Sequence, residues 1–135
     1  TNGQIQVSGG QLNTTYIGTS DSKVGSYEQT GGTAKTQYMY TTNDISLTGT
    51  SNFTSLAGGS INSGNDLIIS GEDVSVTFND AVKAKSITIN DGASVTLAAN
   101  KTMTASGQNG IAVDSAKITL GDKATLKTTA TNSNI

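Results

Sequence analysis

The sequence predicts an all-β chain folded as a right-handed parallel β-helix, or β-solenoid, with three short strands and about 22 residues per coil. Three observations support this prediction: a segment that recurs along the chain, a series of short alternating apolar triplets, and the absence of proline. Proline would remove a backbone donor from the hydrogen bonds between coils. The expected domain is one β-helix of about six coils over residues 1–135, as a segment of a longer rod or fibre.

The recurring segment predicts the length of one coil. Residues 8–16 (SGGQLNTTY) return 22 positions later as residues 30–38 (TGGTAKTQY), and a looser copy begins at Ala57 (AGGSINS). Glycine tolerates the positive φ of tight corners, so we expect the glycine pairs at equivalent corners of successive coils. These structural turns are Gly9, Gly10, Gly31, Gly32, Gly58 and Gly59. Because the third pair follows the second by 27 residues, we also expect a five-residue loop within Thr48 to Leu56.

The apolar triplets predict which side chains face the interior. Each triplet has an apolar residue, an outward residue that is mostly Ser or Thr, and a second apolar residue, which is the period of a half-buried strand. Three successive triplets make one coil, so the triplets should stack in three columns. The expected columns are Ile45, Leu67, Ile87 and Ile111; then Val74, Val95 and Ile118; then Met103 and Ala124. The expected structural core is Ile45, Leu67, Val74, Ile87, Val95, Met103, Ile111 and Ile118.

The composition excludes several classes of protein. Thr, Ser, Asn and Gly make up about half of the chain, and only 33% is hydrophobic, so intrinsic disorder is the first alternative. The β-branched triplets, the low charged fraction of 13% and the lack of proline argue against disorder. The net charge is −2 and every basic residue is Lys, so no basic patch for nucleic acid is expected. No apolar run is long enough to insert into a membrane as a helix.

Two stretches resemble a known class of bacterial protein. Residues 12–20 (LNTTYIGTS) leading into residues 24–33 (VGSYEQTGGT), and residues 82–107 (VKAKSITINDGASVTLAANKTMTASG), resemble the β-helix repeats of autotransporter passenger domains and related surface adhesins. The resemblance covers most of the chain and implies a passenger segment or a secreted relative. It transfers no family active site to this sequence.

The residue types available for chemistry are few. The chain has no His and no Cys, which excludes Ser-His and Cys-His nucleophilic sites and the usual zinc sites. The densest acidic cluster is Asp66 with Glu72 and Asp73, which we interpret as solvated turn residues rather than an acid–base pair. The same stretch echoes a calcium-binding repeat but lacks its nine-residue spacing. We therefore expect no catalytic residue, no metal site and no cofactor.

The sequence thus favours an extracellular structural and adhesive module of a bacterial surface protein, without catalysis. The alternative is a subunit of an extracellular filament that assembles by end-to-end stacking of coils, because neither Thr1 to Val7 nor Thr125 to Ile135 carries a capping pattern. A carbohydrate-active enzyme and an ice-binding protein are the remaining hypotheses; the second would use outward threonines. These are Thr77, Thr88, Thr96, Thr119 and Thr125. The expected partner is another copy of the chain, a host or cell surface, or a glycan.

Overall fold

The computed structural model describes residues 3–135, which form fifteen β-strands. The strands are β1 (Gln4–Val7), β2 (Gln11–Ile17), β3 (Ser26–Gln29), β4 (Thr33–Thr41), β5 (Ile45–Leu47), β6 (Asn52–Ser63), β7 (Asp66–Ser70), β8 (Ser75–Phe78), β9 (Ala81–Ala84), β10 (Ser86–Asn90), β11 (Ser94–Leu97), β12 (Thr102–Ala105), β13 (Ile111–Asp114), β14 (Lys117–Leu120) and β15 (Thr125–Thr128). Residues 3–135 contain no helix with the length and hydropathy needed to cross a bilayer. Thr1 and Asn2, part of the predicted N-terminal edge, lie outside the described residues.

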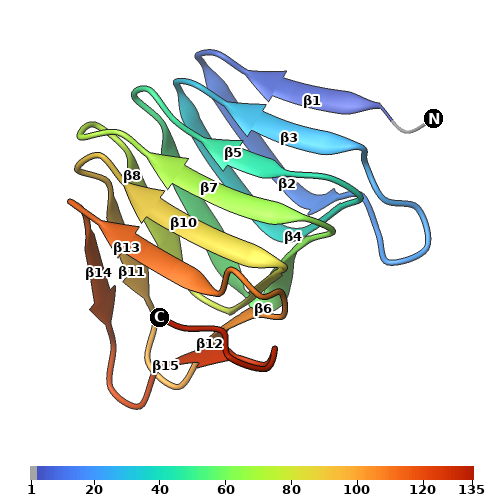
Figure 1. Cartoon of the computed structure of the whole chain (residues 1–135). Helices are drawn as coiled ribbons and strands as arrows, with labels where there is room; N and C mark the ends of the chain where they lie inside the picture. Colours follow the sequence, from blue (N-terminus) through green and yellow to red (C-terminus); the bar gives the residue numbers. More distant parts are fainter. Residues whose placement is uncertain (1–2) are drawn as a thin grey trace.

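The strands stack in parallel on three faces, and the chain passes from one coil to the next along a single axis (Figure 1). The first face is a six-stranded sheet in the order β1-β3-β5-β7-β10-β13. The long strands β2, β4 and β6 turn a corner, so their first halves belong to the second face and their second halves to the third face. The second face continues through β8, β11 and β14, and the third through β9, β12 and β15. The predicted parallel β-solenoid of about six coils is therefore confirmed.

The strand register confirms the predicted coil length. Gln11 of β2 pairs with Thr33 of β4, which is the shift of 22 residues seen in the sequence. Other coils are shorter or longer: Tyr27 pairs with Ile45, and Ile87 pairs with Ile111. The differences lie in the corners, because the strands themselves keep a continuous ladder. The right-handed sense of the coil stays a prediction.

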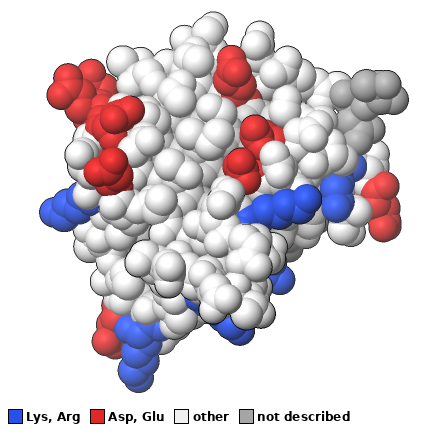
Figure 2. All heavy atoms as spheres, viewed as in Figure 1, with Lys and Arg blue, Asp and Glu red and all other residues white. Residues whose placement is uncertain are grey.

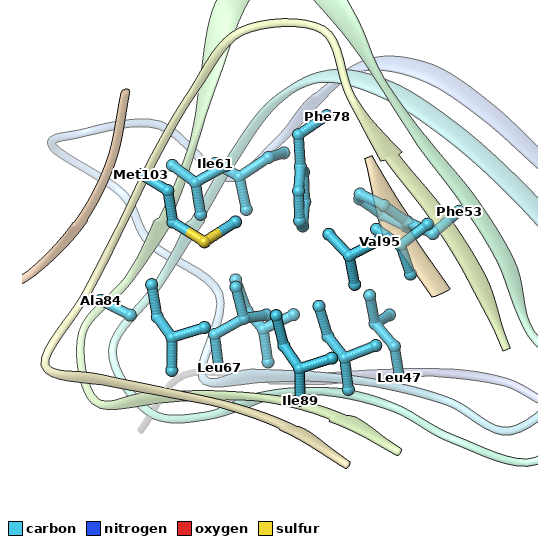
Figure 3. Close-up of a cluster of buried hydrophobic side chains, with 14 of the residues drawn as sticks. Leu47, Phe53, Ile61, Leu67, Phe78, Ala84, Ile89, Val95 and Met103 are labelled. Atoms are coloured by element: carbon cyan, nitrogen blue, oxygen red, sulfur yellow. The ribbon is translucent and has the colours of Figure 1, made fainter. Parts of the chain in front are cut away.

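The interior is filled by the inward members of the alternating strands. Side chains from the first face meet those of the second and third faces along the axis (Figure 3). Tyr27, Phe53 and Phe78 form an edge-to-face aromatic series, with ring centroids 6.0 and 6.2 Å apart. Such contacts add to the burial of apolar area, which is the main source of stability. Of the eight expected core residues, seven are buried and Ile118 is partly buried.

The columns of stacked side chains correct part of the sequence prediction. The first column is confirmed, since Ile45, Leu67, Ile87 and Ile111 are successive register partners. The second column is confirmed for Val95 and Ile118 but was wrong by two residues at Val74, and the third was wrong by two residues at Ala124. Val95 stacks on Val76 and Ile118, so Val74 is buried in the corner before β8 instead. Likewise Met103 stacks on Leu126, and Ala124 lies in the preceding turn. Residues i and i+2 of a strand point the same way, so alternation alone does not distinguish these two alignments.

The third glycine pair does not occupy the predicted corner. Gly10 and Gly32 have φ of 72° and 75° at the corner between the first and second faces, as expected. Gly58 and Gly59 lie instead within β6, at the corner between the second and third faces. The register between β4 and β6 shifts here: Thr36 pairs with Ser55, but Tyr38 pairs with Ser60.

The predicted five-residue loop within Thr48 to Leu56 was therefore wrong. Leu56 to Gly59 are four residues opposite the single residue Gln37, so this bulge adds three residues to the coil. A Cβ at Gly59 would overlap the carbonyl group of Gln37, so the second glycine of this pair permits a close approach of two backbones. In the sequence, a glycine pair that permits close approach of two backbones looks the same as a pair at a corner with positive φ.

Polar side chains enter the interior near the N-terminal end, where they bond to one another or to the backbone. The Tyr27 hydroxyl donates to Gln29 Oε1 at 2.9 Å, and Gln29 Nε2 donates to the carbonyls of Gly32 and Asn52. Burial raises the pKa of the Tyr27 phenol above its ordinary value. The buried Ser51 hydroxyl donates to the carbonyls of Gln29 and Thr48. Each group is satisfied, which is the condition for burying polar atoms without a large penalty.

Candidate functional site

A shallow depression lies on the outer surface of the first face. Its volume is about 320 Å³, and outward side chains of β1, β3, β5 and β7 bound it. The lining residues are Gln4, Ser26, Tyr27, Glu28, Asn43, Asp44, Ser46 and Ile68. A second depression of about 230 Å³ adjoins it and shares Glu28. We call the two together the first-face groove.

The strand register explains why the surface is hollow here. Gln6, Glu28, Ser46 and Ile68 are successive partners on four adjacent strands, and all point outward. Ser46 is much shorter than Glu28 and Ile68 on either side of it, so the surface is lower at β5. Gln6 Nε2 donates to Glu28 Oε1 at 3.4 Å and closes one side of the groove.

Asp44 is held rigidly at the other side of the groove. Its Oδ1 accepts from Asn65 Nδ2 at 2.7 Å and from the backbone N–H of Asp66 at 3.0 Å. Asp66 in turn accepts from the Ser86 hydroxyl at 2.7 Å, so its carboxylate faces the next coil. The groove thus presents amide, hydroxyl and carboxylate groups on a fixed backbone, which suits hydrogen bonding to a polar ligand.

The structure separates the acidic residues that the sequence placed together. Asp66 begins β7, whereas Glu72 and Asp73 lie in the turn after its other end. Acidic side chains gather over the turns that follow β7, β10 and β13, at the upper left of Figure 2. Among residues 3–135, no group of three or more acidic, His or Cys side chains is arranged to hold a metal ion.

The outward threonines are distributed over all three faces. Thr77, Thr96 and Thr119 are register partners on the second face and continue from Thr54. Thr88 lies on the first face and Thr125 on the third. The threonines that the sequence suggested for an ice-binding surface therefore do not form one array.

The sequence interpretation missed two surface features: the first-face groove and a cluster of tyrosines on the third face. The groove residues lie on different coils, about 20 residues apart in the sequence, so no short sequence motif contains them. The tyrosines had a usable signal, because the repeat that aligns Gly10 with Gly32 also aligns Tyr16 with Tyr38. An outward aromatic residue that recurs at the coil period predicts a stacked pair.

Comparison of the chain with protein-family models, with curated proteins and with solved structures found no match in any of the three. The structure shows a β-solenoid architecture and identifies no family.

Proposed function

We propose that this chain is a structural and adhesive module of an extracellular bacterial surface protein, and that it acts without catalysis. The observation that carries the proposal is the first-face groove, a concave polar surface on a rigid ladder of parallel strands. A solenoid makes contacts only between neighbouring coils, so it holds a binding surface in place along a rod. The absence of His and Cys supports binding rather than covalent chemistry.

Adhesion is tested by coating beads with the chain and measuring their retention on bacterial and epithelial cell layers. Ser46→Arg fills the groove with a long charged side chain at an outward position and should abolish retention. Thr96→Arg adds the same side chain to the exposed second face and is the matched control. Equal retention of the two variants would show that the groove is not the adhesive surface.

The absence of catalysis is tested separately. The chain is incubated with soluble polysaccharides, and newly formed reducing ends are measured over a day. We expect no release above the rate without protein. Release that disappears in a Glu28→Gln variant would replace the adhesive proposal with that of a carbohydrate-active enzyme.

The filament is the second candidate, and the last coil favours it. Val113 and Leu120 are 38% and 42% exposed, whereas their partners in the preceding coil, Ile89 and Leu97, are fully buried. The Asn134 carbonyl accepts from the Ile111 N–H, so the tail covers only the start of β13. Another copy stacked on this coil would bury the remaining apolar side chains and pair the free strand edges.

Sedimentation velocity and electron microscopy of the free chain distinguish the two candidates. Concentration-dependent rods that disappear in Leu120→Lys would support end-to-end stacking, because the substitution places a charge on the stacking surface. The matched control is Thr119→Lys, which adds the charge to the outer surface of the same strand. A monomer at all concentrations would exclude the filament and leave the adhesive module.

A further inference from the structure

The surface aromatic residues of this chain all lie in one place. The sequence has four Tyr and two Phe. Tyr27 and both Phe are buried, whereas Tyr16 of β2 and Tyr38 and Tyr40 of β4 stand on the third face. Tyr16 is 56% exposed. We call these three residues the tyrosine platform. Aromatic side chains gathered on a rigid surface are typical of recognition sites, because they offer a large contact area at little entropic cost.

The three rings are nearly parallel. Tyr16 stacks on Tyr38 with centroids 4.8 Å apart and 7° between the planes, and Tyr38 is 6.5 Å from Tyr40 at 12°. The Tyr38 hydroxyl donates to the Gly58 carbonyl of the next coil at 2.9 Å, so its ring leans over that coil. Because the planes agree, the other two rings lean the same way.

One ring face of the platform has no stacked aromatic partner. Tyr16 covers one face of Tyr38, but the opposite face of Tyr16 has no stacked aromatic partner among residues 3–135, and Tyr16 is the most exposed of the three. Tyr40 lies closer to the backbone of the preceding coil, since its carbonyl accepts from the Val24 N–H at 3.0 Å. A Cβ at Gly18 would come within 2.7 Å of the same carbonyl oxygen, so glycine permits this close approach of the two backbones.

The bulge beside the platform is held in place by Asp80. Asp80 Oδ2 accepts from the Gly58 N–H at 2.7 Å and lies 3.4 Å from Lys101 Nζ. Burial alone would raise the pKa of Asp80, but the Gly58 and Ala81 N–H groups and Lys101 hold it below its ordinary value. The carboxylate therefore keeps the Gly58 carbonyl where it accepts the Tyr38 hydroxyl, so the platform is preorganised.

We propose that the tyrosine platform binds a neutral glycan, with the C–H face of a pyranose ring stacked on the open face of Tyr16. The C–H bonds of a pyranose carry partial positive charge and match the negative face of an aromatic ring. Small polar residues surround the rings and can bond to the sugar hydroxyls. In the next coil the Asn62 amide donates to the Ser60 hydroxyl at 2.8 Å, and both lie on the outer surface.

A glycan fits this surface better than a protein partner does. A stable protein interface buries about 800 Å² on each side around an apolar centre. Beyond the platform, the third face continues outward with Ala81, Lys83, Thr102 and Thr104, which are small or polar. Among residues 3–135, the one large exposed aliphatic side chain beside the platform is Leu56 in the bulge. The aromatic area therefore matches one or two sugar rings.

This inference names a ligand class for the adhesive function proposed above, and it is tested apart from the groove. Native electrophoresis is run in gels that contain a soluble neutral glucan, xylan, mannan or galactan. At least one polysaccharide should retard the chain. Tyr16→Ala should weaken this retardation by about tenfold, since it removes the ring on which the sugar stacks. Tyr16→Phe keeps the ring and should bind like the original chain.

The variants distinguish failure of the platform from failure of the adhesive proposal. If no polysaccharide retards the chain but beads still adhere through the groove, the platform inference is wrong and the adhesive module stands. If retardation persists in Tyr16→Ala and is lost in Ser46→Arg, the glycan binds the groove and the platform inference is again wrong. Tyr16 is exposed, so its variants should keep the parent circular dichroism spectrum and urea midpoint.

Discussion

Replacing Ile87 with alanine should destabilise the solenoid strongly. Ile87 is fully buried in β10 and stacks between Leu67 and Ile111 of the neighbouring coils. The substitution removes three carbon atoms, worth about 2.4 kcal/mol at about 0.8 kcal/mol for each buried methylene. The cavity adds to this because coils above and below hold the surrounding backbone, which gives a loss of about 2–4 kcal/mol in the free energy of unfolding.

The matched control is the adjacent residue. Thr88 points outward from the same strand and is only partly buried, so Thr88→Ala should cost less than about 0.5 kcal/mol. Both variants are compared by urea unfolding, followed by far-ultraviolet circular dichroism, with the free energy extrapolated to water. Equal losses for the two substitutions would refute the assignment of inward and outward positions.

Three further outcomes are expected. Gly32→Ala should lower the free energy of unfolding, measured in urea, more than Gly10→Ala does. Both glycines have positive φ, which costs alanine about 1–2 kcal/mol. Only at Gly32 would the added Cβ also meet backbone, 2.6 Å from the Gly10 carbonyl oxygen. Stability should fall as the pH rises above about 10, because Tyr27 ionises in the unfolded chain first, and Tyr27→Phe should reduce this slope. The pKa of Asp80 is lowered in the folded chain, so its carboxylate stabilises the fold above the ordinary value of about 4. Stability should fall as the pH drops from there through the lower pKa of the folded state, less so in Asp80→Asn; identical pH profiles for parent and variant would contradict either assignment.

Local patterns in the sequence predicted the architecture because a solenoid repeats the same local solution. The 22-residue recurrence matches the pairing of β2 with β4, and the in-out-in triplets match the inward column from Ile45 to Ile111. Where coils differ in length, the patterns failed. The bulge from Leu56 to Gly59 moved the third glycine pair to another corner, and a shift of two residues preserved the alternation while changing the partner of Val95.

The class of fold, the coil length and the absence of His and Cys chemistry could be predicted from residue types and their period alone. The positions of the groove and the platform could not, because they depend on contacts between coils. The groove depends on short Ser46 lying between Glu28 and Ile68 on adjacent strands, and the tyrosine platform depends on Tyr16 stacking on Tyr38 of the next coil. These neighbours are separated by a whole coil, and corner lengths vary from coil to coil. Their contacts therefore exist only once the register between coils is set, which is a property of the folded stack.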